Sequence, residues 1–197
     1  MGLEFRELEG RIIGCRRCPR LVAWREKVAR EKVRRFRDQE YWGRPVPAFG
    51  DPDAALVIVG LAPAAHGGNR TGRMFTGDRS GDWLYEALFR SGFAGKPESV
   101  APGDGLVLRD CLITAAVRCA PPGNKPLPEE MDRCREYLRL ELQLDARKRV
   151  VIVLGRIAFE TFFKISRQEG MQAASPKPEF RHGGEYALPG GVTLIAS

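Results

Sequence analysis

The sequence predicts an α/β fold, a three-layer α/β/α sandwich with a central four-stranded, mainly parallel sheet. Four short apolar runs rich in β-branched residues are typical of strands buried on both faces. Helical patterns separate these runs, and alternating strands and helices favour helix layers on both sides of one sheet. The expected strands are residues 56–60, 112–117, 150–154 and 192–196.

Helical patterns are found at about residues 3–13, 80–91, 128–144 and 157–165. The third opens with Pro128 and has two glutamates in its first turn. This suits a helix start, because Pro lacks the N–H that a first turn leaves unbonded and acids favour the positive end of the helix dipole. Residues 168–190 are rich in Gly, Pro and Ser, and we expect a long connection there with room for a hairpin.

Length and composition indicate one globular domain spanning residues 1–197. The 32 Lys and Arg residues outnumber the 25 Asp and Glu residues, and the net charge of +7 fits a polyanionic partner such as DNA. Seven of the thirteen residues at 25–37 are basic, as on a solvated face or on one that contacts phosphates. With no long apolar run and no signal-like N-terminus, we expect a cytoplasmic, nucleoid-associated monomer without a membrane partner.

The five cysteines favour a metal or cluster site, since an odd number without a secretion signal argues against a disulfide framework. Cys15 and Cys18 have the spacing at which one turn binds a single centre. Cys119 ends the second strand, and Cys134 faces inward on the next helix. Cys111, at the start of that strand, is expected in the core. Zinc, an iron-sulfur cluster and ordinary buried thiols all remain compatible with this pattern.

In open parallel sheets, ligands bind beyond the carboxyl ends of the strands. The loops that begin at Gly60, Arg118, Gly155 and Ser197 are therefore expected to face one cleft. The glycine-rich segment 67–73 lacks the Gly-Lys-Ser/Thr ending of a phosphate loop, so nucleotide hydrolysis is not supported.

Two segments, 60–78 and 114–126, resemble the type-5 (B-type) uracil-DNA glycosylases. The likeness covers nearly the whole chain, and its further matches are Cys15-x-x-Cys18-Pro-Arg-Leu, Arg44-Pro-Val-Pro before Phe49-Gly-Asp51, Leu-Gly-Arg-Ile-Ala at 154–158, and Phe180-Arg-His-Gly183. The resemblance implies a DNA repair enzyme that hydrolyses the N-glycosidic bond of uracil in DNA and leaves an abasic site. It also implies a structural [4Fe-4S] cluster bound by Cys15, Cys18, Cys119 and Cys134.

The resemblance further assigns roles in a pocket for a base flipped out of the duplex. Phe75 stacks on the base, Asn124 contacts its polar edge, and Asp78 orients water or stabilises positive charge on the sugar. Gly60, Leu61 and Ala62 begin a loop, Gly60 to Ala65, whose backbone N–H groups can bind the oxygens of the departing base, which would explain the small residues in it. Each side chain also has an ordinary structural interpretation: a core ring for Phe75, a turn residue for Asn124 and a helix N-cap for Asp78.

Type-4 relatives have Glu where Leu61 stands and Asn where Ala115 stands, so the resemblance implies a less polar and less selective pocket. We expect it to accept hypoxanthine and xanthine as well as uracil. Arg70 and Arg73 are candidate contacts to DNA phosphates.

Type-5 members continue after the fourth strand into a histidine-bearing loop and a terminal helix, and we expect residues 1–197 to lack both. His182 matches a different position of the family. An alternative function is a non-catalytic iron-sulfur protein that binds DNA or senses damage. Such a protein would not need Phe75, Asp78 and Asn124 around one pocket.

Overall fold

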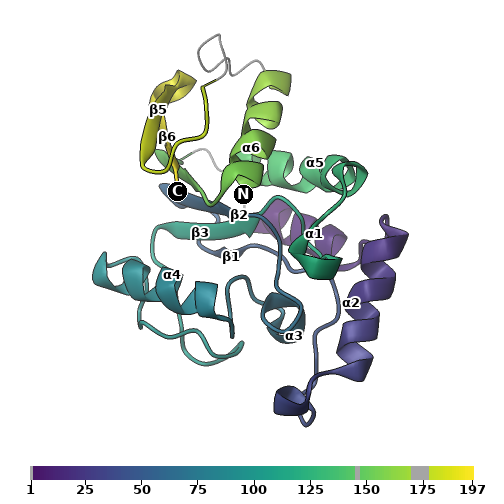
Figure 1. Cartoon of the computed structure of the whole chain (residues 1–197). Coiled ribbons are helices and arrows are strands. Elements are labelled where there is room, and N and C mark those ends of the chain that lie inside the picture. The colour runs from purple at the N-terminus through teal and green to yellow at the C-terminus, as the bar shows by residue number, and fades with distance from the viewer. Residues whose placement is uncertain (1, 145–146, 170–177) are drawn as a thin grey trace.

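The computed structural model describes residues 2–144, 147–169 and 178–197, which fold into one sheet covered by helices (Figure 1). Within this part of the chain, no helix has both the length and the apolar character needed to cross a membrane. The α-helices are α1 (Gly2–Ile13), α2 (Pro19–Glu31), α3 (Gly68–Thr71), α4 (Arg79–Arg90), α5 (Pro128–Leu144) and α6 (Arg156–Gln168). The strands are β1 (Phe49–Gly50), β2 (Leu56–Gly60), β3 (Cys111–Ala115), β4 (Val150–Val153), β5 (Gly184–Leu188) and β6 (Val192–Ala196). Short 3-10 turns are η1 (Arg34–Phe36), η2 (Pro122–Asn124) and η3 (Pro189–Gly191).

The sheet has the strand order β1-β3-β2-β4-β6-β5. Its four central strands are the four predicted ones, and they run parallel to one another as expected. The predicted strand count was too low, because β1 and β5 add antiparallel edges. β1 has only two residues and β5 alternates between buried and exposed positions, so neither forms an apolar run. Within the expected connection 168–190, β5 forms a hairpin with β6, which is the fourth predicted strand, whereas residues 170–177 lie outside the described residues.

The predicted three layers are confirmed by the way successive side chains of β2 alternate between two cores. Val57 and Val59 pack in the core that includes α5 and α6, whereas Leu56 and Ile58 pack in the core that includes α4. Figure 1 shows these helices on opposite sides of the sheet. The alternation follows from the period of two in a strand, and both faces are apolar because both are covered.

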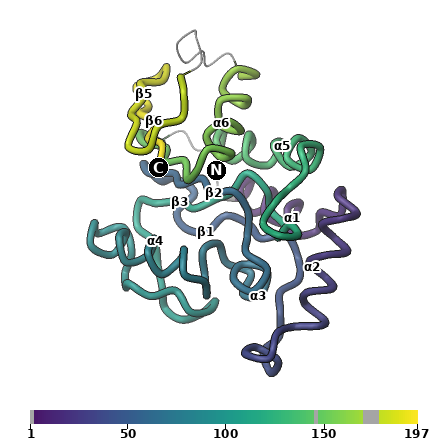
Figure 2. Tube along the Cα trace, in the orientation of Figure 1, coloured from purple at the N-terminus to yellow at the C-terminus, as the bar shows by residue number. Residues whose placement is uncertain are grey.

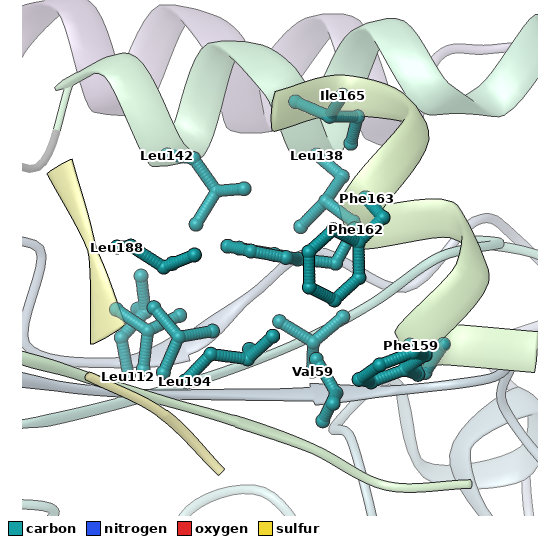
Figure 3. Packing of buried hydrophobic residues seen from close by; sticks show 14 of the residues in the cluster. Val59, Leu112, Leu138, Leu142, Phe159, Phe162, Phe163, Ile165, Leu188 and Leu194 are labelled. Atoms are coloured by element: carbon teal, nitrogen blue, oxygen red, sulfur yellow. The ribbon is translucent and has the colours of Figure 1, made fainter. Parts of the chain in front are cut away.

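Aromatic side chains of α6 fill the larger core (Figure 3). The rings of Phe159 and Phe163 lie 4.7 Å apart between centroids, and Phe162 contacts Phe163 edge to face. Leu138 of α5 is fully buried in the same cluster. Truncating a buried aromatic side chain of this kind typically costs about 3–5 kcal/mol, so this face fixes how α5 and α6 sit on the sheet.

The two N-terminal helices complete a third apolar cluster at one end of α5. α1 packs on α5, and α2 runs along a flank of the molecule beside α3 (Figure 2). Leu8, Ile12 and Leu21 meet three cysteines and Tyr137 there. The cluster therefore joins the N-terminal segment to the body of the protein.

A buried ion pair links the end of β3 to α5. The guanidinium of Arg118 donates to the carboxylate of Glu141, and both side chains are almost fully buried. Thr114 donates a second hydrogen bond to the same carboxylate at 2.6 Å. Because removing one member of a buried pair leaves an uncompensated charge, this pair holds the chain after β3 in one position.

The loop between β2 and α4 is held by a second buried arginine. Arg73 makes a bidentate contact with Asp104 at 2.6 and 3.0 Å and also donates to Thr76 and Ser99. The Arg73 guanidinium, aided by backbone N–H donors and opposed by burial, holds the pKa of Asp104 well below its ordinary value. The carboxylate is thus a fixed anchor for this loop.

We predict that Asp104→Asn lowers the free energy of unfolding at pH 7 by about 2 kcal/mol. A depressed pKa contributes stability that is present above the unfolded-state value of about 4 and is lost as pH falls, so the difference should shrink between about pH 5 and pH 2. Urea unfolding across this pH range measures it. The matched control is the exposed Asp38→Asn, which should change little, and an equal effect of both substitutions would contradict the prediction.

Candidate active site and cysteine cavity

A cavity of about 150 Å³ opens at the carboxyl end of β2, where the strand order places the predicted cleft. We call it the β2 cavity. Three segments form it: the loop after β2, the loop before α4 and the turn after β3. Its lining residues are Leu61, Ala62, Pro63, Ala64, Met74, Phe75, Asp78, Ser80 and Asn124. All the predicted pocket residues except Gly60 therefore line one cavity, although they come from segments up to 63 positions apart.

Gly60 lies behind Phe75 rather than on the cavity wall. A Cβ atom at Gly60 would stand 2.6 Å from the ring carbon Cζ of Phe75, so only glycine lets the ring lie over the end of β2. A Cβ atom added at Gly81 would likewise stand 1.8 Å from the backbone oxygen of Phe75, so this position also requires glycine. Phe75 itself has a φ of +51°, a conformation that costs a non-glycine residue energy and persists where the surroundings impose it.

Asp78 is the N-cap of α4, where its carboxylate accepts a hydrogen bond of 3.0 Å from the N–H of Gly81. The interpretation of Asp78 as a helix N-cap is therefore confirmed. The side chain also lines the β2 cavity, beside Gly67, at which a Cβ atom would stand 2.2 Å from Oδ2. Capping occupies one oxygen, and the group remains at the cavity wall.

Asn124 closes the turn after β3 and is exposed, with a φ of +55°. Among the described residues, its side-chain amide has no hydrogen-bond partner, and the residue lines the β2 cavity. A left-handed Asn is common in turns, which accounts for the backbone but not for the position of the amide at a cavity. The expected contact with a polar ligand edge remains a prediction.

An open groove of about 470 Å³ continues from the β2 cavity along α4. It shares Leu61, Ala62, Phe75 and Ser80 with that cavity and adds Trp83, Leu84 and Leu154. Trp83 is 71% exposed on α4. Sequence reasoning missed Trp83 and Leu154, because an aromatic on the polar face of a helix and the residue that directly follows a strand carry no pattern of their own.

Arg70 and Arg73 are not free to serve as the predicted phosphate contacts. Both are under 10% exposed. Arg70 donates to the carbonyl of His66 and to Gln39, and its guanidinium lies 4.0 Å from the centre of the Phe36 ring. Since Arg73 is bound to Asp104, both guanidinium groups already have partners inside the protein. Their role in the structure is to hold the loop that presents Phe75.

A second cavity is lined by four cysteines, and we call it the cysteine cavity. Cys15 follows α1, Cys18 caps α2, Cys119 follows β3, and Cys134 lies on α5. The four predicted ligands thus meet in space. Cys111 is buried in the core beneath α4 at the other end of β3, so its assignment to the core is confirmed.

Arginines donate hydrogen bonds to the sulfurs in this cavity. Arg25 Nη1 donates to Cys119 Sγ at 2.8 Å, and the backbone N–H of Arg118 donates to Cys134 Sγ at 3.3 Å. Arg25 was expected within a solvated or phosphate-contacting basic stretch, and it instead points inward with 2% exposure. Its spacing from Leu21, Val22 and Val28 on the buried face of α2 is the signal that could have identified it.

Burial opposes ionisation of three of these thiols. It raises the pKa of Cys119 to about 11 and that of Cys134 to about 12, and it also raises the pKa of Cys18. Cys15 differs, because hydrogen bonds from Tyr137 and Arg17 outweigh the effect of burial and lower its pKa. A positively charged centre that binds thiolates would therefore displace protons from buried sulfurs, as metal binding to cysteine generally does.

The four cysteines could bind a metal-containing centre of more than one kind. Within the described part of the chain, no three Cys, His, Asp or Glu side chains are close enough together to bind a single metal ion. Four cysteines nevertheless line one cavity. Four thiolates are the ligand set of a structural zinc ion as well as of an iron-sulfur cluster, so the lining residues alone are compatible with either centre.

Comparison with known proteins identifies the family. Residues 47–192 match the family model of the uracil DNA glycosylase superfamily. The chain belongs to this superfamily. The match spans β2, both loops of the β2 cavity, and Cys119 and Cys134, so the predicted resemblance is confirmed.

Three relatives carry the name type-5 uracil-DNA glycosylase. The protein of Thermus thermophilus is 53% identical over 186 residues, which cover 94% of this chain and 82% of that protein. That of Mycobacterium bovis is 51% identical over 96% of this chain and 69% of its own length. That of Pyrobaculum aerophilum is 47% identical over 98% and 80%, respectively.

We predict that Gly60→Ala lowers the free energy of unfolding of this superfamily member by about 1–3 kcal/mol, because the new methyl group meets the Phe75 ring. In a Phe75→Ala background most of that cost should disappear, since the obstructing ring is gone. Urea unfolding of the four proteins gives the coupling. Gly10→Ala, a helical position with open space around its Cβ, is the control, and additive effects of the two substitutions would refute the contact.

Proposed function

We propose that this protein is a DNA N-glycosylase that hydrolyses the bond between uracil and deoxyribose and leaves an abasic site. The observation that carries the proposal is the meeting of Phe75, Asp78 and Asn124 at one cavity beyond β2. The superfamily match and the names of the close relatives support it. DNA is accordingly the macromolecular partner, and action as a monomer on duplex DNA is part of the proposal.

The β2 cavity provides separate groups to hold the base and to act on the sugar. A base flipped out of the duplex would stack on Phe75, whose ring is held in place by Gly60, while the Asn124 amide contacts the polar edge of the base. Among the described residues, the backbone N–H groups of Ala62 and Ala64 have no partner, and both residues line the cavity. They can donate to the oxygen of the departing base as negative charge develops on it.

Asp78 is suited to act on the sugar side of the glycosidic bond. As the glycosidic bond breaks, positive charge grows on the sugar, and a carboxylate beside it stabilises that charge or orients the attacking water. The N-cap hydrogen bond to Gly81 fixes the direction of this carboxylate. One group can therefore both cap α4 and act at the cavity.

Leu61 suggests the range of bases. It places an apolar side chain on the cavity wall next to the loop that would hold the base. An apolar wall makes few base-specific hydrogen bonds, so we include hypoxanthine and xanthine among the proposed substrates.

The test is alkali-induced strand cleavage of a duplex with one uracil opposite guanine, repeated with hypoxanthine and xanthine. Cleavage at the modified position indicates base removal. Binding of the duplex without cleavage by the folded protein would favour a DNA-binding or damage-sensing protein instead.

We predict that Asp78→Asn lowers the rate of uracil excision about 100-fold or more, with little loss of stability, because Asn caps helices as well as Asp but lacks the charge. Asp78→Ala should lose both activity and about 1 kcal/mol of stability. Single-turnover kinetics and urea unfolding separate the two roles. Full activity of Asp78→Asn would mean that Asp78 serves only as the N-cap of α4.

We further propose that Cys15, Cys18, Cys119 and Cys134 hold a [4Fe-4S] cluster. The observations that support it are the single cavity lined by four cysteines and the hydrogen-bond donors to its sulfurs. Hydrolysis changes no oxidation state. When bound, the cluster would supply a cross-link between the N-terminal segment, the chain after β3 and α5.

Cys119→Ser is predicted to abolish the brown colour and most of the bound iron and sulfide of anaerobically purified protein. Cys111→Ala is the matched control, because it removes a buried cysteine outside the cavity, and it should retain both. Iron and sulfide analysis with visible spectroscopy measures the outcome. If the wild-type protein is colourless and contains stoichiometric zinc, the four cysteines bind zinc and the proposal of a cluster is wrong.

A further inference from the structure

Arg25 is a buried cation that has no acidic partner among the described residues. Its side chain lies on the inward face of α2 with 2% exposure. Within the part of the chain that the structure describes, no carboxylate forms an ion pair with it. Of the other buried arginines in the described residues, Arg73 and Arg118 pair with Asp104 and Glu141. Arg70 is instead bonded to two backbone carbonyls and Gln39 and lies over the Phe36 ring, so its donors are used without an ion pair. Burying an unpaired charge is costly, so the position of Arg25 calls for a negative partner of another kind.

The hydrogen bonds of Arg25 go to two different cysteine segments. Nη1 donates to Cys119 Sγ at 2.8 Å, and Nη2 donates to the backbone carbonyl of Cys15 at 3.1 Å. Its Nε is buried and has no hydrogen-bond partner among the described residues. The Arg25 guanidinium thus links the Cys15 and Cys119 segments of the cysteine cavity, and its Nε–H remains without a hydrogen-bond partner among the described residues.

The rest of the cavity wall has the same sign of charge. Arg17, Arg118 and Arg133 line it together with Arg25, and no Asp or Glu belongs to its described lining. Side chains of Arg17 and Arg133 also bond to Cys15 and Cys18. Arg17 and Arg118 are neutralised by Glu136 and Glu141 outside the lining, whereas Arg25 and Arg133 form no ion pair among the described residues. The charge of these two arginines suits an anionic group, and a cluster bound by four thiolates is one, because the thiolate charges outweigh that of the iron-sulfide core.

We propose that Arg25 is a positioning residue of the cluster site: its hydrogen bond to Cys119 and its buried charge retain the cluster and raise its reduction potential. This inference rests on the proposed cluster. The physical reason is that a cation and a donor at a ligand sulfur stabilise the more negative, reduced state most, and they also lower the free energy of the bound state. A side chain that served only to pack α2 would leave the potential unchanged.

The test compares Arg25→Met, which keeps length but removes charge and donors, with Arg25→Lys, which keeps charge, and Arg25→Gln, which keeps donors without charge. Arg30→Met is the control, since Arg30 lies exposed on the same helix and its loss changes net charge equally. Anaerobically purified proteins are followed by visible bleaching in excess chelator and by redox titration of the cluster.

We expect Arg25→Met to bleach at least tenfold faster than wild type, with a more negative midpoint potential, and Arg25→Lys to fall between them. Arg30→Met should match wild type in both measurements. If Arg25→Met does not fold, the Lys and Gln variants decide: wild-type behaviour of Arg25→Gln would overturn the role of charge. Wild-type bleaching and potential in all Arg25 variants would overturn the inference, whereas iron-free wild-type protein would overturn the cluster itself.

Discussion

The parallel pairing of β2 on both of its edges is the constraint on which the β2 cavity depends. β2 pairs with β3, so that Gly60 lies opposite Ala115, and with β4 on its other side. Both faces of β2 are buried, and a slip of one residue would move each side chain to the wrong core. The register therefore fixes the point at which the chain leaves the sheet, and with it the place where the Phe75 ring can lie.

The chain after β3 connects the two cavities. Cys119 and Asn124 are only five positions apart, yet the first lines the cysteine cavity and the second lines the β2 cavity. The buried pair of Arg118 and Glu141 holds the start of this segment to α5, which also carries Cys134. A centre bound in the cysteine cavity would thus steady one wall of the proposed base pocket without taking part in hydrolysis.

Some of the arginines that contribute to the positive charge of this protein are buried and bind groups inside it. A net charge of +7 suggests an external field that attracts DNA. Arg25, Arg70 and Arg73 are nevertheless turned inward, where they bind a cysteine sulfur, backbone carbonyls and Asp104. Part of the positive charge that the composition would lead one to expect on the surface therefore lies inside the protein, where it holds segments together. Composition cannot distinguish the two, because it carries no information about which side of a helix or loop is covered.

The amino-acid sequence by itself determined the parallel core, the helices α1, α4, α5 and α6, the cysteines that meet and the residues that line the β2 cavity. Strand and helix periods are local properties, and the ordered motifs of the superfamily are carried by the residues themselves. Only the tertiary structure decided that Arg25 faces the cysteines, that Arg70 and Arg73 are bound internally, and that Trp83 lies exposed beside the pocket. These outcomes depend on contacts between segments far apart in the chain, such as α2 with the loop after β3, and no local pattern records which distant partner a side chain will meet.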